Sequence, residues 1–364
     1  FRSGYGEKLR EHLTKETQID QLIDFGDADI FTSIAYPSIL LARKLGQKEA
    51  LNPDQPVRAL TWMPGPPLDD FPDVFAAKSF TLPQRELKKD GWRLEGTTVR
   101  DLLAKLRKAG KPLGEYVNGR FYRGILTGLN EAFVVDRETR DRLIVEHPSS
   151  KAVLKPFLRG RDVKRWCAQP QDLWLIFTRR GIDIRKYPAI HDYLKPFKKR
   201  LMPGGPGGRK PGSYEWHEIQ DNIAYWQEFE KKKIIVPAIA ETMQCTYDTS
   251  GFYVNNKASI FVPDNPKYVA TILNSEVARW VTTQLCASKQ GGFWDFEPRY
   301  STQFPIPRAS AAQQKALEKL VDQILAAKKK DAAADVSRWE REIDRQVYEL
   351  YGLTEDEIKI VEGA

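Results

Sequence analysis

The chain has 364 residues, of which 41% are hydrophobic and 29% are charged, a composition typical of a folded globular protein. This length allows two or three domains with a sizeable buried core. Lys and Arg total 57 against 49 Asp and Glu, and the formal charge of +8 favours an anionic partner, although proteins that bind none often carry a similar excess.

Several classes of protein are excluded by what the sequence lacks. No apolar run approaches the roughly 20 residues of a membrane-spanning helix, so we expect no membrane partner. The three cysteines, Cys167, Cys245 and Cys286, are too widely spaced for a disulfide framework, which favours a reducing cytoplasmic location. The sequence has no Walker loop, no GxGxxG after a strand, no HExxH and no GxSxG.

The first part of the chain predicts a helix followed by two strands. Apolar residues at helical spacing predict a helix over 5–16, and strand patterns follow at 19–25 and 34–42 with a turn at 26–29 between them. This order is typical of the last part of an α/β sheet. The chain opens at Phe1 without a Met or a signal-type segment, so we expect a fragment whose earlier strands lie upstream.

The middle of the chain predicts a mixture of short elements. Residues 45–87 contain recurrent prolines and few periodic apolar residues, which indicates a connector or an irregular insertion. A short basic helix is expected at 101–108. A Gly/Pro-rich loop at 203–212 is either disordered or ordered by a ligand. The strands expected in this region are 123–125, 132–135, 173–178, 234–239 and 252–262.

The C-terminal part predicts helices. Ser310 with Gln313 forms a capping box before an amphipathic pattern, and a second helix ends at Gly352. Another capping box follows at Thr354 and Glu357. We expect an antiparallel helical pair whose simplest role is to support the fold or to mediate dimerisation.

The segment KPFLRGRDVKRW, residues 155–166, is the first candidate for nucleic-acid binding. Arginine side chains bind phosphates through two parallel hydrogen bonds and contact guanine edges in the major groove. A solvated basic turn is the alternative interpretation. The candidate contact residues in this segment are Arg159, Arg161, Lys164 and Arg165.

A second basic run, residues 195–200, precedes the Gly/Pro-rich loop. Its Lys198 and Arg200 are candidate phosphate contacts, and a charged helix end is the alternative.

The expected strand 252–262 has alternating faces. One face is apolar, and the other carries Tyr253, Asn255 and Lys257, which we expect to contact DNA bases or to line a solvated sheet surface.

The segment SKQGGFWDFEPRY, residues 288–300, combines basic and aromatic residues. Lys289 and Arg299 are candidate DNA contacts, because such a mixture suits base stacking and backbone contact. Packing in the core is the alternative for Phe293 and Phe296.

Two other patterns resemble functional motifs only weakly. Residues 265–268, Asn-Pro-Lys-Tyr, are similar to the Asn-Pro-Pro-aromatic tetrad of amino-methyltransferases, but the second proline is missing and a turn is the simpler interpretation. Glu215, His217 and Glu218 lie close together in a polar stretch, where solvated side chains are commoner than metal ligands. We therefore predict no metal site.

Taken in order, several segments resemble the C-terminal half of TaqI-type adenine-N6 DNA methyltransferases, which include the fused Type IIG restriction-modification enzymes. The resemblance covers nearly the whole chain except about residues 49–110. It is carried by YGEKLREHL, IDQLIDFGDADIF, IAYPSILLARK, FYRGILTGLNEAFVVDRETRDRLI, KPFLRGRDVKRW, LWLIF, YVNN, ILNS, GGFWDFEPRYSTQFPIP and WEREIDRQVYELYGL.

The resemblance implies an α+β fold with four parts. Residues 1–48 would be the end of a Rossmann-like methyltransferase domain, 49–115 a connector or insertion, 116–307 the target recognition domain and 308–364 the C-terminal helices. The partner would be double-stranded DNA.

The resemblance also implies a site-specific, adenine-specific DNA methyltransferase as the parent protein, possibly fused to an endonuclease. The family's FxGxG loop for S-adenosylmethionine and its catalytic NPPY tetrad precede the point that matches Phe1, so we expect neither cofactor binding nor catalytic residues in this fragment. Phe31 matches the aromatic residue that packs against the adenine flipped out of the helix. A core or hairpin-tip phenylalanine is the alternative.

Two rival functions remain open. The chain could be a specificity or scaffold subunit that docks a separate catalytic chain through its C-terminal helices. A nuclease would rest on Asp73 and Lys78, which lack a second spaced carboxylate nearby. The sequence does not determine the oligomeric state or the DNA sequence recognised.

Overall fold

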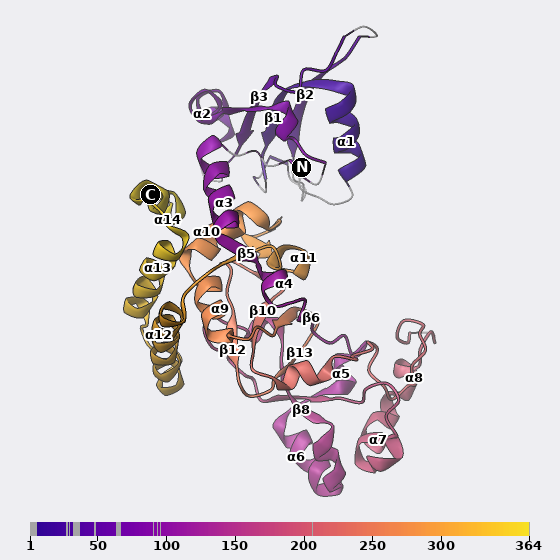
Figure 1. Ribbon diagram of the computed structural model, residues 1–364. Coiled ribbons are helices and arrows are strands. Elements are labelled where there is room, and N and C mark those ends of the chain that lie inside the picture. Colours follow the sequence, from indigo (N-terminus) through magenta and orange to yellow (C-terminus); the bar gives the residue numbers. More distant parts are fainter. Residues whose placement is uncertain are drawn as a thin grey trace. The chain divides into compact units, whose positions relative to one another are not determined.

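The computed structural model describes residues 6–26, 28, 30–31, 37–46, 49–62, 67–89, 91–92, 94, 96–205 and 207–363. The chain forms two compact units (Figure 1). Unit 1 comprises Phe1–Lys108, Trp280–Asp295 and Thr354–Ala364, and unit 2 comprises Ala109–Arg279 and Phe296–Leu353. Helices and strands alternate irregularly in both, and the fold is mixed α+β as expected.

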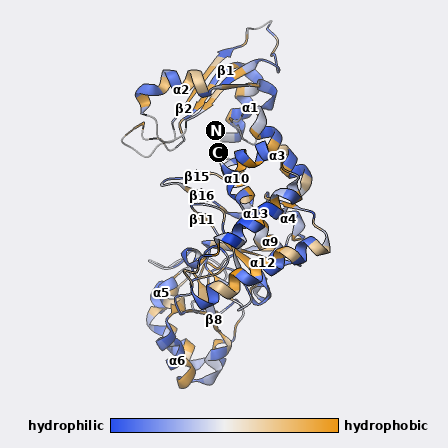
Figure 2. Ribbon diagram, turned by 90° about the vertical axis from the view of Figure 1, so that its left-hand side faces the viewer, coloured by the Kyte–Doolittle hydropathy of each residue, from blue (hydrophilic) through white to orange (hydrophobic). Residues whose placement is uncertain are grey.

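Unit 1 is built on a four-stranded sheet in the order β2-β1-β3-β4. β1 (Thr17–Asp24) pairs antiparallel with β2 (Ser38–Lys44) and parallel with β3 (Pro56–Thr61), and β4 (Phe80–Pro83) runs antiparallel to β3. Hydrophobic residues are frequent along β1 in Figure 2, and Ile19 of this strand is fully buried.

The segment interpreted from its prolines as a connector supplies two strands of this sheet. Pro56 begins β3 and Pro83 ends β4, and Pro72 lies at the start of helix α2 (Phe71–Lys78). Proline is tolerated at these positions because its missing N–H is not needed there. These prolines therefore lie at the ends of helices and strands and do not indicate an irregular segment.

The helices of unit 1 lie before, between and after the strands. The helix expected at 5–16 is α1, and the basic helix expected at 101–108 begins earlier, as α3. Residues 34–36, the start of the second expected strand, lie outside the described residues. The remaining elements are α1 (Glu7–Glu16), η2 (Leu68–Asp70), η3 (Gln84–Glu86), α3 (Thr97–Ala109), β15 (Ser288–Lys289), β16 (Phe293–Asp295) and α14 (Glu355–Glu362).

Unit 2 contains two four-stranded sheets. The first has the order β12-β10-β14-β6 and is antiparallel throughout, and the second has the order β13-β8-β9-β7. The strands are β6 (Phe121–Arg123), β7 (Val134–Val135), β8 (Leu154–Leu158), β9 (Leu173–Ile176), β10 (Lys233–Pro237), β12 (Thr246–Asp248), β13 (Tyr253–Val254) and β14 (Ala258–Phe261).

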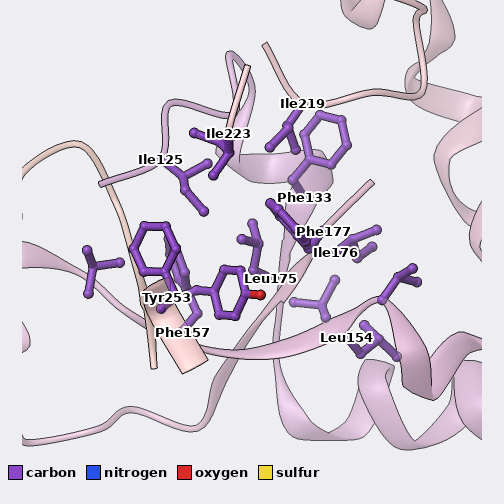
Figure 3. Packing of buried hydrophobic residues seen from close by; sticks show 14 of the residues in the cluster. Ile125, Phe133, Leu154, Phe157, Leu175, Ile176, Phe177, Ile219, Ile223 and Tyr253 are labelled. Carbon is purple, nitrogen blue, oxygen red and sulfur yellow. The ribbon is translucent and has the colours of Figure 1, made fainter. Parts of the chain in front are cut away.

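The main core of unit 2 lies around the second sheet. Figure 3 shows Tyr253 among Phe157, Leu175 and Phe177, and all four side chains are buried. The Tyr253 ring stacks on Phe229 with centroids 4.9 Å apart.

Three expected strands of unit 2 differ from the structure. The expected strand 252–262 consists of β13 and β14 separated by a turn. The first half of the expected strand 132–135 belongs to helix α5 (Asn130–Phe133) and the second half is β7. Strand β6 overlaps the strand expected at 123–125 only at Arg123. These errors fall where tertiary hydrogen bonds override local β propensity.

The helices at the end of unit 2 confirm the predicted caps. α12 (Ala311–Lys330) has the Ser310 capping box, and α13 (Ser337–Tyr351) ends at Gly352, whose φ is 63°. Both helices contact α9 (Pro266–Leu273), and α12 carries both hydrophilic and hydrophobic residues in Figure 2.

The other elements of unit 2 are short. They are α4 (Leu113–Tyr116), α6 (Arg137–Glu146), η4 (Pro148–Ala152), η5 (Gly160–Asp162), η6 (Ile184–Lys186), α7 (Pro188–Leu194), η7 (Lys195–Phe197), α8 (Lys198–Leu201), η8 (Trp226–Glu230), β11 (Ile239–Ala240), α11 (Pro298–Ser301) and the pair β5 (Gly110–Pro112) and β17 (Pro305–Pro307). Helix α10 (Glu276–Leu285) runs from unit 2 into unit 1.

Candidate nucleic-acid interface

Two loops of unit 2, one after β6 and one after β13, lie in direct backbone contact. Ile125 donates its N–H to the Val254 carbonyl (2.8 Å) and accepts from the N–H of Asn256 (3.0 Å). A Cβ atom on Gly124 would lie 2.0 Å from the carbonyl oxygen of Asn255. Only glycine permits this approach.

A third segment, which follows β8, joins the same place. Asn255 donates its backbone N–H to the Leu158 carbonyl (3.1 Å), and its side-chain Oδ1 accepts from the N–H of Gly160 (3.0 Å). A Cβ atom on Gly160 would lie 2.1 Å from the Lys257 carbonyl oxygen. Asn255 therefore holds three loops together, and its observed role is structural.

Cations project from all three loops. Arg123, Arg161 and Lys257 are exposed, and no hydrogen bond or ion pair links these side chains to any described part of the protein. Lys164, three residues after Arg161, is also exposed and equally unpaired among the described residues. We refer to these four residues as the basic junction.

Arg123 was not among the residues selected from the sequence. It lies directly before Gly124 in FYRGILTGLN, part of a segment that carries the family resemblance. This position could have identified Arg123 as a candidate DNA contact. Its nearness to Lys257 depends on the pairing of β6 with β14, which is not visible in the sequence.

Arg159 is engaged within its own turn. Its Nε and Nη2 donate to the two oxygens of Asp162, both at 3.0 Å, and the Asp162 side chain is only 5% exposed. A bidentate pair with a buried carboxylate fixes the turn but leaves little of the guanidinium for a phosphate.

Arg165 is tied to two other elements. Its Nε lies 3.3 Å from a carboxylate oxygen of Glu340 on α13, and its Nη2 donates to the Asn274 carbonyl (2.5 Å) at the end of α9. The neighbouring Trp166 is buried, and its Nε1 donates to Glu340 (2.6 Å). Arg165 therefore joins the basic turn to the C-terminal helices.

The second basic run is divided between paired and free cations. Arg200 donates to Glu131 (2.7 Å), and the Nζ of Lys198 lies 5.3 Å from the centre of the Trp216 ring. Lys195 and Lys199 are exposed, and no ion pair involves them in the part of the chain that the structure describes.

The Gly/Pro-rich loop is held by an arginine of its own. Arg209 is 5% exposed and donates to the carbonyls of Leu201, Thr127 and Glu218, among others. Burial lowers the pKa of Arg209 to about 10, which still leaves it charged at neutral pH. The Arg209 side chain therefore ties the described part of this loop to neighbouring segments of unit 2.

The expected polar face of residues 252–262 does not form. Tyr253 is fully buried and donates to Glu230 through its hydroxyl (3.3 Å), and Ser259 is 3% exposed. The cause is the turn between β13 and β14, which breaks the alternation. Burial argues against a DNA contact by Tyr253, whereas the exposed Lys257 remains a candidate.

Lys289 and Arg299 belong to different units. Lys289 lies 3.3 Å from Asp295 on the neighbouring strand of a hairpin in unit 1. Arg299, in unit 2, has its guanidinium 4.8 Å from the centre of the Tyr300 ring. Phe293 is 37% exposed, whereas Phe296 is buried. Packing in the core, the alternative interpretation, therefore holds for Phe296.

Phe31 lies at an apolar cavity of unit 1. The ring is 61% exposed, and the cavity has a volume of about 570 Å³. It is lined by Phe25, Ile30, Phe31, Pro37, Ser38, Ile39, Leu68 and Phe71. A flat, apolar guest would fit such walls, and the contact between Phe31 and a flipped base stays a prediction.

The described lining of the same cavity offers few polar groups to S-adenosylmethionine. Its lining includes one polar side chain, Ser38, and neither a carboxylate nor a glycine among the described residues. The cofactor's amino, carboxylate and ribose groups would lack partners among these residues. The expectation that this fragment binds no cofactor stays a prediction.

The weaker motifs have structural roles. Asn265 caps α9 by accepting from the N–H of Tyr268 (3.2 Å), and Tyr268 is fully buried. Glu218 accepts backbone N–H groups from Gly181 and Glu215, and burial lowers the pKa of His217. The described residues contain no group of acidic, His or Cys side chains arranged to hold a metal.

Comparison with known families gives a match to part of the chain. Residues 155–306 match the family model of the TaqI-like C-terminal specificity domain. The resemblance found in the sequence is confirmed for this segment, which contains Arg161, Lys164 and Lys257 of the basic junction. A comparison with curated protein sequences gives no match.

Comparison with solved structures gives matches over nearly the whole chain. One is the Type IIL restriction-modification enzyme MmeI in complex with DNA, with a TM-score of 0.55 and 12% identity over 96% of this chain and 45% of that chain. Another is the type IIG restriction endonuclease BpuSI, with a TM-score of 0.42 and 11% identity over the same shares of the two chains. The chain thus spans less than half the length of these enzymes.

Proposed function

We propose that this chain recognises a specific sequence in double-stranded DNA as part of a restriction-modification enzyme. The observation that carries the proposal is the basic junction, which gathers cations without a partner among the described residues. Three of its four residues lie within 155–306, the segment that matches a specificity domain. Cations with no partner in the protein are free to neutralise phosphates. Arginine among them can also contact guanine edges.

We infer the chemistry of the parent enzyme from the sequence resemblance. The parent would be an adenine-N6 DNA methyltransferase that uses S-adenosylmethionine, with Phe31 beside the flipped adenine. This chain contains neither FxGxG nor NPPY. We therefore propose that it binds DNA but transfers no methyl group by itself.

Duplex binding at different salt concentrations tests the proposal. The probe is a pool of short duplexes with a randomised central region, and the test variant is the pair Arg161→Ala, Lys257→Ala. If each side chain neutralises one phosphate, the pair lowers the slope of log affinity against log salt by about 1.8. Between about 50 and 200 mM salt, the affinity of the variant should then fall about 12-fold less than that of the unmodified chain.

The matched control is the pair Lys315→Ala, Lys319→Ala on the exposed side of α12, which removes the same charge. Its slope should equal that of the unmodified chain. Absence of duplex binding, or equal slopes for both pairs, would refute the proposal. The adenine assignment is tested separately, by asking whether the full-length parent methylates adenine within the sequence that this chain selects.

A further inference from the structure

Helix α13 carries two acids that bind neighbouring elements of unit 2. Glu340 accepts from Trp166 Nε1 (2.6 Å) and lies 3.3 Å from Arg165, at the end of the basic turn. One helical turn later, Asp344 accepts the N–H of Glu276 (2.8 Å) at the start of α10. The Glu340 side chain is 19% exposed, so its contacts are largely shielded from water.

The turn that Glu340 holds has a strained end. Trp166 has a φ of 71°, in the left-handed region that aromatic residues rarely adopt, and its side chain is 2% exposed. Such a conformation is unfavourable and persists only where surrounding contacts fix it. The contacts here are the backbone bonds of Trp166 with Cys245 and Tyr247 and the side-chain bond to Glu340.

The other end of the turn is also fixed. Asp162 accepts both the backbone N–H of Arg159 (2.8 Å) and its guanidinium, and Gly160 packs on Lys257. Arg161 and Lys164 project between these two fixed ends. Their positions therefore depend on both anchors.

We propose that Glu340 is a positioning residue for DNA recognition: it anchors Trp166 and Arg165 so that Arg161 and Lys164 face the duplex together. The inference rests on the proposed function of the basic junction. It gives the C-terminal helix α13 an indirect part in recognition, because its residues act through the basic turn and need not touch DNA.

The direction in which one substitution changes DNA affinity distinguishes a positioning role from a simple electrostatic effect. Glu340→Ala removes a negative charge and frees Arg165, so Coulomb attraction alone predicts tighter DNA binding. Loss of positioning predicts weaker binding and a salt slope lower by about 1 to 2, because Arg161 and Lys164 no longer contact phosphates together. Glu342→Ala is the matched control, since Glu342 lies on the same helix and pairs only with residues of α13 in the described structure.

The experiment measures binding of the 364-residue chain to the duplex pool. We expect Glu340→Ala to bind more weakly, Glu342→Ala to bind as well or more tightly, and Glu340→Gln, which keeps an acceptor for Trp166, to bind almost normally. In a chain that already carries Glu340→Ala, adding Arg161→Ala should weaken binding by less than half the factor measured for Arg161→Ala alone. Trp166→Phe, which removes the indole N–H donor together with part of the ring, should reproduce the loss and serves if Glu340→Ala fails to fold.

Each outcome is decisive. If the unmodified chain does not bind duplex DNA, the proposed function fails. If it binds and the Glu340→Ala and Trp166→Phe variants keep its affinity and salt slope, the proposed function stands and the positioning role of Glu340 is wrong. Independent effects of Glu340→Ala and Arg161→Ala would also overturn it.

Discussion

Gly124 offers the sharpest test of how the basic junction is built. A Cβ atom there would lie 2.0 Å from the Asn255 carbonyl oxygen and 2.8 Å from that of Val254, whereas ordinary contact begins at 3.4 Å. Gly124→Ala therefore requires the two loops to separate by about 1.4 Å. No flexible side chain can absorb this shift, because the opposing atoms belong to the backbone.

The separation would break the backbone bonds that join the loops. The N–H of Gly124 donates to Ala258 (2.9 Å), and Ile125 bonds with Val254 (2.8 Å) and Asn256 (3.0 Å). Each bond would lengthen beyond hydrogen-bonding distance. At about 1 kcal/mol for each bond, Gly124→Ala should lower the free energy of unfolding by about 3 kcal/mol.

Urea unfolding followed by tryptophan fluorescence measures this loss, with Gly205→Ala as the control. A Cβ on Gly205 would lie 3.4 Å from its nearest neighbour, so that variant should change stability by less than about 1 kcal/mol. A Gly124→Ala variant as stable as this control would refute the reasoning. Weakened duplex binding should accompany the loss of stability, because Arg123 and Lys257 separate with the loops.

Three further predictions concern other parts of the chain. Burial raises the pKa of Asp344 from 3.8 to about 6, so its stabilising contribution is complete below pH 3.8 and is lost as pH rises through 6. In urea unfolding, the Asp344→Asn variant should therefore be more stable than the unmodified chain by up to about 3 kcal/mol at pH 8 and equally stable below pH 4. A stability difference that does not change with pH would contradict this prediction. Arg209→Met should destabilise unit 2 by about 3 kcal/mol or more, because it leaves buried carbonyls without donors. Thermal unfolding measures this loss, and the control Lys210→Met, at an exposed position, should change little. Equal changes in the two variants would contradict the prediction. In the full-length parent, Phe31→Ala should impair methylation more than DNA affinity, and equal losses would indicate that the ring has only a structural role.

Elements whose signals are local could be predicted from the amino-acid sequence. The capping boxes at Ser310 and Thr354, and the stop at Gly352, lie where the sequence placed them. Such signals depend on residues three or four apart, and the same residues satisfy the helix end in the folded chain. The family resemblance over the recognition segment was likewise available from the order of its motifs.

Only the tertiary structure decided which candidate residues are free to bind DNA. Arg159 and Arg161 look equivalent in the sequence, yet one pairs with buried Asp162 and the other is exposed without a partner among the described residues. Tyr253 lies two residues from Asn255 and is fully buried. The physical reason is that pairing and burial depend on residues far apart in the chain, such as Gly160 against Lys257 and Trp166 against Glu340, which local spacing does not encode.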